Sequence, residues 1–508
     1  MASESQDLPQ LDVLVVGGGI NGAGIARDAA GRGLKVALCE SDDLAVHTSS
    51  KSTKLIHGGL RYLEHFEFRL VRESLSERET LLKAAPHIVW PLRFVLPHDP
   101  GLRPRWMIRA GLWLYDSLGA RRRLEASRSV DLRQHQLGLV LQDRLRHGFV
   151  YSDCWVQDAR LVVLTVMDAK QRGAEILTRT ELVKAEMEQG RWRVTLRGCR
   201  GETVTRRTRT IVNAAGPWVG SLLKGSLDTH SDKRLQLVAG SHIVVPKIHH
   251  HDEAFIFQNT DGRIVFAIPY ERHFSLIGTT ERQYSGDPGD VDVTEAEVQY
   301  LCECVSRYLR TPVSAGEVVW SFSGVRALFD GGVTDTSSVS RDYVLETGDW
   351  QSRPVISVFG GKLTTYRKLA EAAVDLLCEG LSHAAGAWTG NAVLPGGDLP
   401  YGSLKDFIKQ LSGMRPDLSE QLVDRLARTY GTRVFEFLSD TAGGDELGEE
   451  VVPGLFEAEI GYACTSEWVR TGDDMLWRRT KLGLHLSVEQ RRRVDAAVAS
   501  MTTIGVLA

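Results

Sequence analysis

The beginning of the chain shows the pattern of a strand, a glycine turn, a helix and a second strand. The apolar run 11–16, LDVLVV, is typical of a buried strand in a parallel sheet. The glycine-rich stretch 17–22 follows at once, and the small residues in 23–32 predict a helix that lies close to the sheet. A second apolar run, 35–39, ends at Glu40 and completes a βαβ unit.

Two later apolar runs predict further strands of the same sheet. Residues 210–215 end in small residues, and residues 355–359 lead through Gly360-Gly361-Lys362 into a helix expected over 363–377. Between these runs, β-branched and aromatic stretches separated by turn residues predict a largely antiparallel sheet within 242–278. A linker rich in Gly, Ala and Pro precedes a C-terminal part with helical patterns.

Composition adds few restrictions. The 508 residues carry a formal net charge of −4 with 43% hydrophobic residues, which suits a globular protein of about two to four domains. The near-neutral charge gives no indication of nucleic-acid binding. The seven cysteines form no CxxC motif, so we expect a reducing cytoplasm and no metal site. The first ten residues lack a signal-peptide pattern, and no run of 18 apolar residues predicts a membrane-spanning helix.

The glycine-rich stretch fits a dinucleotide-binding turn. Gly17, Gly19 and Gly22 form G-x-G-x-x-G, which allows a tight turn and lets the helix N-terminus take a pyrophosphate. Glu40 lies 18 residues after Gly22, near the spacing at which a carboxylate holds ribose hydroxyls. No arginine directly follows Glu40 to meet a 2′-phosphate, which disfavours NADP. The motif alone does not separate NAD from FAD.

Two basic stretches indicate anion binding. Residues 51–65, KSTKLIHGGLRYLEH, crowd lysine, histidine and arginine around a glycine pair, although a solvated basic loop would have the same composition. Lys362 follows two glycines and precedes a helix that Thr364 or Thr365 could cap. Backbone N–H groups and positive charge predict an anion there, either the edge of a flavin ring or a substrate phosphate. The alternative is a surface lysine beside a helix cap.

The segment 103–123, RPRWMIRAGLWLYDSLGARRR, is apolar and aromatic at helical spacing, except for a stripe of Arg109 and Asp116. Its arginine-rich ends suit a helix that lies on an anionic lipid surface, and it is too short and too charged to span a bilayer. The alternative is a buried core helix with charged ends.

Several longer motifs identify a family. The segments 16–33, 47–71, 213–219 and 360–370 resemble the FAD-dependent glycerol-3-phosphate dehydrogenases, most closely the bacterial aerobic, respiratory type. They read VGGGINGAGIARDAAGRG, HTSSKSTKLIHGGLRYLEHFEFRLV, NAAGPWV and GGKLTTYRKLA, and the resemblance continues through LWRRTKLGL near the end of the chain. One departure is Arg326-Ala327-Leu328-Phe329, where the family usually has Arg-Pro-Leu-Cys; without proline the loop after Arg326 loses a fixed φ.

The resemblance implies a mixed α/β (α+β) fold. A Rossmann-like FAD-binding domain would receive an inserted antiparallel β-rich substrate domain and be followed by a C-terminal helical domain. The expected limits are 1–85, 151–228 and 321–385 for the FAD-binding domain, 86–150 for a connecting segment with the membrane-contact candidate, 229–320 for the β-rich domain and 400–508 for the helical domain.

The resemblance also implies the chemistry. The cofactor would be FAD, the reaction the oxidation of sn-glycerol 3-phosphate to dihydroxyacetone phosphate, and the electron acceptor a membrane quinone. The protein would be cytoplasmic and attached peripherally to the inner face of the cell membrane, and we expect a homodimer.

The candidate site residues follow from this reaction and from the matching motifs. His57 is the first choice of base because histidine accepts a proton near neutral pH, with His65 and His242 as alternatives. The substrate candidates are Arg61, Tyr62, Arg326, Arg341 and Lys362, of which Arg326 and Lys362 are also expected to be catalytic. The FAD candidates are Gly17, Gly19, Ile20, Asn21, Gly22, Glu40, Thr48, Ser49, Ser50, Lys54, Leu55, Ala215, Gly216, Gly361, Lys362, Leu363 and Thr364.

Three rival functions remain to be distinguished. A soluble glycerol-3-phosphate oxidase would pass electrons to oxygen. Another flavoenzyme of the amino-acid oxidase class would bind a carboxylate with the same arginines. A flavin-binding or membrane scaffold without activity would not explain so many basic residues near the predicted flavin.

Overall fold

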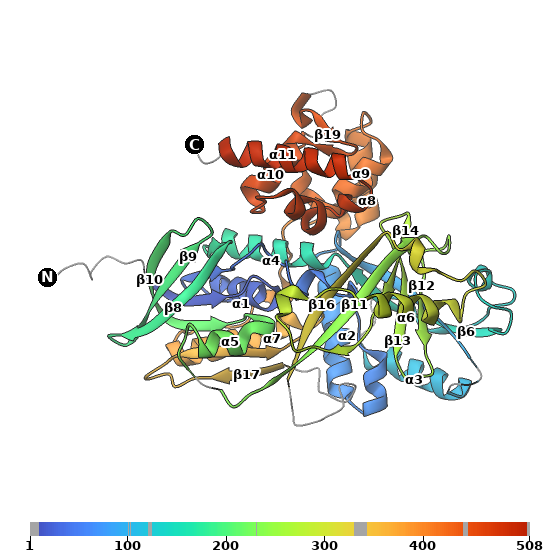
Figure 1. Cartoon of the computed structure of the whole chain (residues 1–508), viewed down its shortest axis with the longest axis horizontal. Coiled ribbons are helices and arrows are strands. Elements are labelled where there is room, and N and C mark those ends of the chain that lie inside the picture. Colours follow the sequence, from blue (N-terminus) through green and yellow to red (C-terminus); the bar gives the residue numbers. More distant parts are fainter. Residues whose placement is uncertain are drawn as a thin grey trace.

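The computed structural model describes residues 10–99, 101, 103–119, 124–229, 231–329, 343–439 and 445–504. Two large sheets lie side by side, and a mostly helical C-terminal part sits above them in the view of Figure 1. The fold is a mixed α/β fold, as predicted.

The first sheet has eight strands, with β17-β18-β10-β1-β2-β7 in order and β9 pairing both β10 and β8. The strands are β1 (Gln10–Val16), β2 (Val36–Cys39), β7 (Glu175–Leu177), β8 (Thr180–Glu188), β9 (Arg191–Gly198), β10 (Thr203–Asn213), β17 (Tyr343–Thr347) and β18 (Val355–Gly360). Because β1 pairs in parallel with β2 and β10, and β10 with β18, the carboxyl ends of these four strands meet at one edge.

Both faces of the first sheet are covered, which explains the continuous apolar run of β1. Val13 and Val15 pack with helices α1 (Ile20–Gly31), α4 (Asp158–Gln171) and α7 (Tyr366–Leu381). Leu14 and Val16 point to the other face and pack with β8, β9 and the short helix α5 (Val219–Lys224). A parallel strand buried on both faces has no polar side to alternate with.

The second sheet has ten strands. The order is β15-β11-β14-β13-β12-β4-β6-β3, with β16 on β11 and β5 on β6. The strands are β3 (Leu55–Ile56), β4 (Val89–Pro97), β5 (Arg128–Asp131), β6 (His147–Val156), β11 (Leu235–Pro246), β12 (Ala254–Gln258), β13 (Ile264–Tyr270), β14 (Phe274–Gly278), β15 (Arg282–Gln283) and β16 (Trp320–Phe329). Helices α2 (Phe68–Ala84), α3 (Arg105–Leu118) and α6 (Glu295–Ser306) pack around it.

This β-rich sheet extends beyond the limits 229–320 that the sequence indicated. The segment 86–150 is more than a connection, because it supplies β4, β5 and the beginning of β6. Strand β4 contains Pro91 and Pro97, and prolines argue against a sheet strand in a single sequence. At the other end, β16 crosses the expected limit at residue 321 and pairs with β11 along its whole length.

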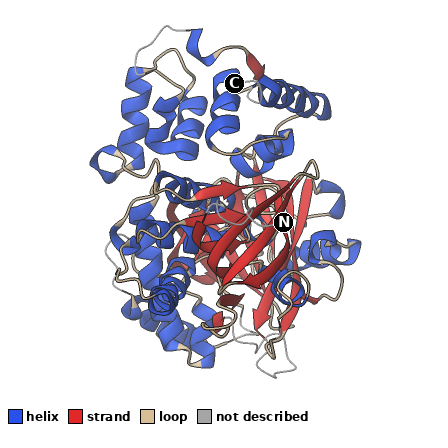
Figure 2. Ribbon diagram, turned by 90° about the vertical axis from the view of Figure 1, so that its left-hand side faces the viewer, coloured by secondary structure: helices blue, strands red, loops and turns tan. Residues whose placement is uncertain are grey.

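The C-terminal part contains helices α8 (Leu404–Met414), α9 (Glu420–Tyr430), α10 (Glu457–Ser466) and α11 (Val488–Ile504), together with a hairpin of β19 (Glu450–Val452) and β20 (Leu455–Phe456). Figure 2 shows these helices as a separate group above the two sheets. A short π-helical turn, Asp474–Arg479, lies between α10 and α11. Within the described part of the chain, no helix has the length and apolarity needed to cross a membrane.

Candidate active site

A cavity of about 920 Å³ lies where the carboxyl ends of β1, β2, β10 and β18 meet the β-rich sheet. Ligands of open parallel sheets bind at this edge because the connecting loops converge there. The wall contains most of the predicted residues: Gly17, Gly19, Ile20, Asn21, Glu40, Thr48, Ser49, Leu55, His57, Tyr62, Ala215, Gly216, Arg326, Gly361, Lys362, Leu363 and Thr364. One cavity therefore collects segments that lie more than three hundred residues apart.

Gly22, Ser50 and Lys54, three predicted FAD residues, do not line the cavity. A Cβ on Gly22 would lie 1.9 Å from the carbonyl oxygen of Gly17, so this glycine allows the helix to pack against the turn. The Ser50 side chain is buried, and the Lys54 ammonium donates hydrogen bonds to the Ser50 carbonyl and to Asp158. These residues support the site from behind its wall.

Three further predicted residues lie partly or wholly outside the described part of the chain. The side chains of Arg61 and His65 and the whole of Arg341 lie outside the described residues. The backbone of the first two belongs to the 3-10 helix η2 (Leu60–His65) beside the cavity. Their roles stay predictions.

Glu40 shapes the dinucleotide turn. Its carboxylate accepts hydrogen bonds from the backbone N–H of Gly18, at 2.6 Å, and of Asp42, at 2.9 Å. Gly17 has a φ of +116°, and a Cβ there would lie 2.5 Å from the carbonyl oxygen of Ala214. The turn 17–22 thus requires glycine at position 17 and has the Glu40 carboxylate beside it. This arrangement fits the adenosine diphosphate part of a dinucleotide.

The 3-10 helix η1 (Thr48–Ser50) is fastened to the same turn. The backbone N–H of Ile20, the first residue of α1, donates to Ser49 Oγ at 3.0 Å. Thr48 Oγ1 donates to the carbonyl of Val325 at 2.7 Å, which ties η1 to strand β16. The hydroxyl-rich segment therefore joins the nucleotide turn to the strand that carries Arg326.

The second glycine turn joins the two basic stretches. Gly360 and Gly361 have φ values of +80° and +103°, which place Lys362 on the cavity wall. The Lys362 ammonium lies 4.1 Å from the centroid of the Tyr62 ring, a cation–π contact. The N–H of His57 donates to Thr364 Oγ1 at 3.3 Å, so the two turns hold each other. Lys362, Tyr62 and His57 are thereby brought together.

The expected start of helix α7 was too early. The helix begins at Tyr366, three residues after the predicted first residue, 363, and its N-cap residue Thr365 makes no side-chain cap bond. Thr365 thus occupies the predicted N-cap position, but its side chain does not bond to the helix. Thr364 uses its hydroxyl for the loop of His57 instead.

Arg326 reaches the cavity from the middle of β16. Its Nη2 lies 3.2 Å from Thr279 Oγ1, and its Nη1 lies 3.3 Å from the Glu281 carboxylate. Both partners also line the cavity. The guanidinium is thus held in place by two side chains of the β14–β15 connection, neither of which was a predicted site residue.

His242 and His57 occupy different positions. His57 lines the cavity, whereas His242 is 1% exposed and lies behind the wall. The His242 Nε2 lies 2.9 Å from Thr53 Oγ1, and Thr53 does line the cavity. Burial, with the nearby charges of Arg326 and Lys54, lowers the pKa of His242 well below its usual value. His242 therefore contacts the cavity wall through Thr53 and does not itself line the cavity.

A buried cluster that sequence reasoning missed holds the loop of His57. The N–H of Gly58 donates to the Tyr115 hydroxyl at 2.8 Å, and this hydroxyl donates to Asp153 at 2.7 Å. Arg78 donates to the same carboxylate at 2.7 Å. The signal in the sequence is weak: Asp153 is a single acid in strand β6, and it is buried like its neighbours.

Tyr115 also shows which face of α3 is buried. Leu112 and Tyr115 point into the core, and Arg109 donates to Ser127 Oγ at 2.8 Å. Ser127 in turn donates to Asp116 at 2.6 Å. Arg109 and Asp116, the charged stripe of α3, therefore make structural contacts with Ser127. The tryptophans of this helix remain at the surface.

Comparisons with known proteins agree with this architecture. Residues 12–367 match the model of the FAD dependent oxidoreductase family, and residues 387–504 match the C-terminal domain of alpha-glycerophosphate oxidase. A glycerol-3-phosphate dehydrogenase of Pseudomonas aeruginosa is 51% identical over 490 residues, which are 96% of this chain and 95% of that protein. A D-erythritol 1-phosphate dehydrogenase of Brucella abortus is 48% identical over 481 residues, 94% of this chain and 96% of that protein.

A solved structure extends the likeness to three dimensions. The glycerol-3-phosphate dehydrogenase of Bacillus halodurans, complexed with FAD, has a TM-score of 0.73 and 26% identity to this chain. The match covers 99% of this chain and 95% of that chain.

Proposed function

The chain belongs to the FAD-dependent glycerol-3-phosphate dehydrogenases, and from this premise we propose that it oxidises sn-glycerol 3-phosphate to dihydroxyacetone phosphate and passes the electrons to a membrane quinone. FAD is the cofactor. The observation that carries the proposal is that Arg326, Lys362, Tyr62 and His57 line the same cavity as the glycine turn of the dinucleotide motif. Two cations near a candidate base suit a phosphorylated alcohol.

In the proposed reaction the cations bind the phosphate. Arg326 offers a planar guanidinium held by Thr279 and Glu281, and Lys362 offers an ammonium over the Tyr62 ring. His57 takes the proton of the hydroxyl on carbon 2 at a ring nitrogen. FAD, when bound, supplies the acceptor for the hydride that leaves carbon 2. We further expect Arg61 and Arg341 to bind the phosphate.

A longer polyol phosphate is the second candidate substrate. The observation in its favour is the relative from Brucella abortus, which is named for D-erythritol 1-phosphate and is 48% identical to this chain. The basic residues described above would bind either phosphate. The discrimination therefore depends on the side chains beside the polyol, and on measurement with both substrates.

One side of the cavity suits an apolar electron acceptor. The wall there includes the apolar residues Phe94, Leu96, Ile256, Ile264 and Phe266, from strands β4, β12 and β13. The same apolar cluster receives the buried face of helix α3. A quinone ring arriving from the α3 side would meet apolar residues on its way to the flavin, which supports a quinone over oxygen as acceptor.

The outer face of α3 supports membrane contact. Trp106 is 70% exposed and Trp113 is 64% exposed. Both indole rings would be removed from water if this face of the helix lay in a lipid interface. Phe66 and Phe68 are exposed nearby, since α3 packs against η2 and α2. We propose that this aromatic surface, defined as Phe66, Phe68, Trp106, Met107 and Trp113, rests on the inner face of the cytoplasmic membrane. Arg121, Arg122 and Arg123 lie outside the described residues.

The experiment that tests the function is an anaerobic visible spectrum of the purified protein before and after addition of sn-glycerol 3-phosphate. Prompt bleaching of the yellow colour, followed by its return on addition of a short-chain quinone, is the expected result. Bleaching with D-erythritol 1-phosphate alone would support the second candidate, and colour unchanged by both would contradict the proposal. Size-exclusion chromatography with light scattering tests the expected homodimer.

A further inference from the structure

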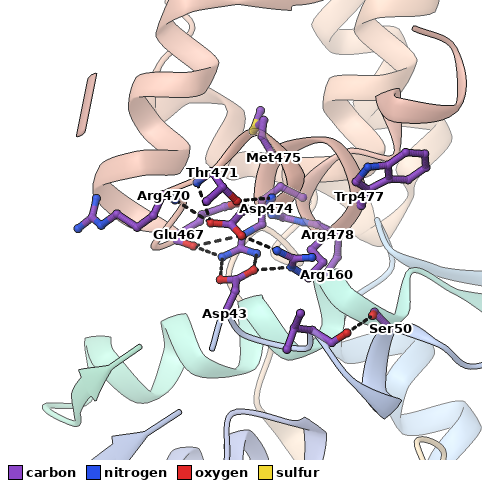
Figure 3. A network of polar contacts seen from close by, with 12 residues as sticks. Asp43, Ser50, Arg160, Glu467, Arg470, Thr471, Asp474, Met475, Trp477 and Arg478 are labelled. Carbon is purple, nitrogen blue, oxygen red and sulfur yellow. Dashed lines mark hydrogen bonds and ion pairs between the residues drawn. The ribbon is translucent and has the colours of Figure 1, made fainter. Parts of the chain in front are cut away.

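A buried ion pair joins the C-terminal part to the nucleotide-binding sheet. The guanidinium of Arg479 binds both oxygens of the Asp43 carboxylate, at 2.6 and 2.8 Å, and Arg478 Nε adds a third contact at 2.6 Å. The Arg479 side chain is 0% exposed and that of Asp43 is 1% exposed. Figure 3 shows Asp43 pointing toward these contacts from the FAD-binding side. The contact spans more than four hundred residues of sequence.

Asp43 belongs to the loop that forms the adenosine side of the cavity. Glu40 precedes it by three residues, and Asp42 and Ala45 on either side both line the cavity. The N–H of Ala45 donates to the Gly18 carbonyl at 3.2 Å, and the carboxylate of Glu40 accepts from the Gly18 N–H. The loop 40–46 is therefore closed onto the dinucleotide turn, and Asp43 is its only buried acid.

The arginines are rigidly presented by the π-helical turn Asp474–Arg479. The Asp474 carboxylate accepts from the backbone N–H groups of Arg470, at 2.8 Å, and Thr471, at 3.0 Å. Arg479 Nε also donates to the Glu467 carbonyl at 3.1 Å. π-Helical turns are rare in proteins and frequently lie at functional sites.

A second contact reaches the same loop. Arg179 donates from its side chain to Asp474 at 2.7 Å, and its backbone N–H donates to the Asp42 carbonyl at 2.9 Å. On the other side of the turn, the Trp477 ring stacks on Trp320 at 4.7 Å, and Trp320 begins strand β16, which carries Arg326. The turn thus contacts both the loop 40–46 and the beginning of strand β16.

We propose that Arg479, assisted by Arg478, is a positioning residue for FAD. Through Asp43 it holds the loop 40–46 in the shape that receives the adenosine part of the cofactor, so that the C-terminal part controls how tightly FAD is retained. The proposal rests on the FAD site and not on the identity of the substrate. It assigns a role to the motif LWRRTKLGL, which carries no catalytic group of its own.

The test compares FAD release from holoenzymes. Arg479→Gln leaves Asp43 buried without its bidentate partner, and we expect FAD release at least about tenfold faster than from the unchanged protein. Arg479→Lys keeps one charge but not the fork, so release should be intermediate. Release is followed by flavin fluorescence after dilution, at a temperature at which circular dichroism shows each variant folded.

Arg415→Gln is the matched control. Arg415 is 1% exposed and binds both oxygens of Asp417, at 2.9 and 2.7 Å, but both residues lie within the C-terminal part. Its loss should lower the thermal midpoint and leave FAD release unchanged. If Arg479→Gln does not fold, Arg478→Gln replaces it, and about two- to fivefold faster release is expected because Arg479 still binds Asp43. Release at the unchanged rate, or equal acceleration by Arg415→Gln, would overturn the proposal.

Discussion

The ammonium of Lys54 lies 2.8 and 2.9 Å from the two carboxylate oxygens of Asp158, and neither side chain is more than 1% exposed. Asp158 is the first residue of α4, and Lys54 ends the stretch whose residues 51–53 line the cavity. The Ser52 hydroxyl donates to the same carboxylate at 2.8 Å. The basic stretch 51–65 is therefore anchored to the core helix α4 on the side that faces away from the cavity.

Replacing one partner of this pair should be costly. Lys54→Met leaves a buried, uncompensated carboxylate, which destabilises proteins by about 3–5 kcal/mol. We expect a strongly lowered thermal midpoint and a loss of bound FAD, measured by differential scanning calorimetry and by the flavin absorbance. The double variant Lys54→Met, Asp158→Asn should recover part of the midpoint. A single variant as stable as the unchanged protein would contradict this account of the pair.

Arg326 should contribute to substrate binding and not to FAD binding. Arg326→Ala removes a guanidinium that lines the cavity without contacting the nucleotide turn, so we expect FAD content to be unchanged. A charge-assisted contact between a guanidinium and a phosphate contributes about 3–5 kcal/mol. Its loss should lower kcat/KM for glycerol 3-phosphate by about a hundredfold or more. Steady-state kinetics beside the flavin-to-protein ratio separate the two effects. Equal loss of flavin and activity would assign Arg326 to FAD instead.

Local patterns were sufficient for the nucleotide half of the site. The run 11–16, the glycines of 17–22 and Glu40 predicted the βαβ unit, because parallel strands and dinucleotide turns have strong short-range signatures. The glycine pair before Lys362 predicted an anion site there, and Lys362 does line the cavity. The family resemblance, and not periodicity, selected Arg326.

Long-range partners could not be predicted in this way. Asp153, Thr279 and Glu281 position catalytic candidates through contacts made only after the β-rich sheet has formed. Strand β4 was not predicted, since the expectation for 86–150 was a connecting segment, although β6 pairs with β4 throughout and only the prolines of β4 argue against a strand. The Asp43–Arg479 pair joins residues at opposite ends of the chain, and no spacing rule connects them.

Tyr115 should affect turnover through the loop of His57. Tyr115→Phe removes the hydroxyl that accepts from the Gly58 N–H and donates to Asp153. A buried N–H with a weakened partner costs about 1–3 kcal/mol, and we expect kcat to fall about tenfold with unchanged FAD content. Tyr430→Phe is the control, since Tyr430 is equally buried and binds Glu459 within the C-terminal part. Equal kinetic effects of both variants would exclude a special role of Tyr115.

The aromatic surface on α3 should govern lipid binding. The double variant Trp106→Ser, Trp113→Ser removes two exposed indoles and leaves the buried contacts of Leu112 and Tyr115 intact. Each interfacial aromatic contributes on the order of 1 kcal/mol or more, so we expect at least about a tenfold loss of binding to anionic vesicles in flotation assays. Leu139→Ser, at a residue 71% exposed outside this surface, is the control. Arg109→Glu, by contrast, should disturb folding through Ser127.

Lys481 should make stability depend on pH in the alkaline range. It is 7% exposed, in the turn that follows Arg479. Burial, reinforced by the like charge of Lys54, lowers the pKa of Lys481 to about 7, although Asp158 and Glu271 act in the opposite direction. In the unfolded chain a lysine keeps its usual pKa of about 10.4.

The sign follows from proton binding. Between pH 7 and about pH 10 the unfolded chain binds a proton at Lys481 that the folded protein does not, so the free energy of unfolding rises with pH by at most about 1.4 kcal/mol per pH unit. Lys481→Met removes this dependence and adds only a constant offset from the lost hydrogen bond to the Trp477 carbonyl. We expect the thermal midpoint of the variant, relative to that of the unchanged protein, to be highest below about pH 7. This difference should shrink toward about pH 10. Thermal midpoints of both proteins across this range measure the difference, with Lys405→Met, at an exposed lysine, as the control. A difference that stays constant with pH would show that the Lys481 ammonium is not penalised by burial.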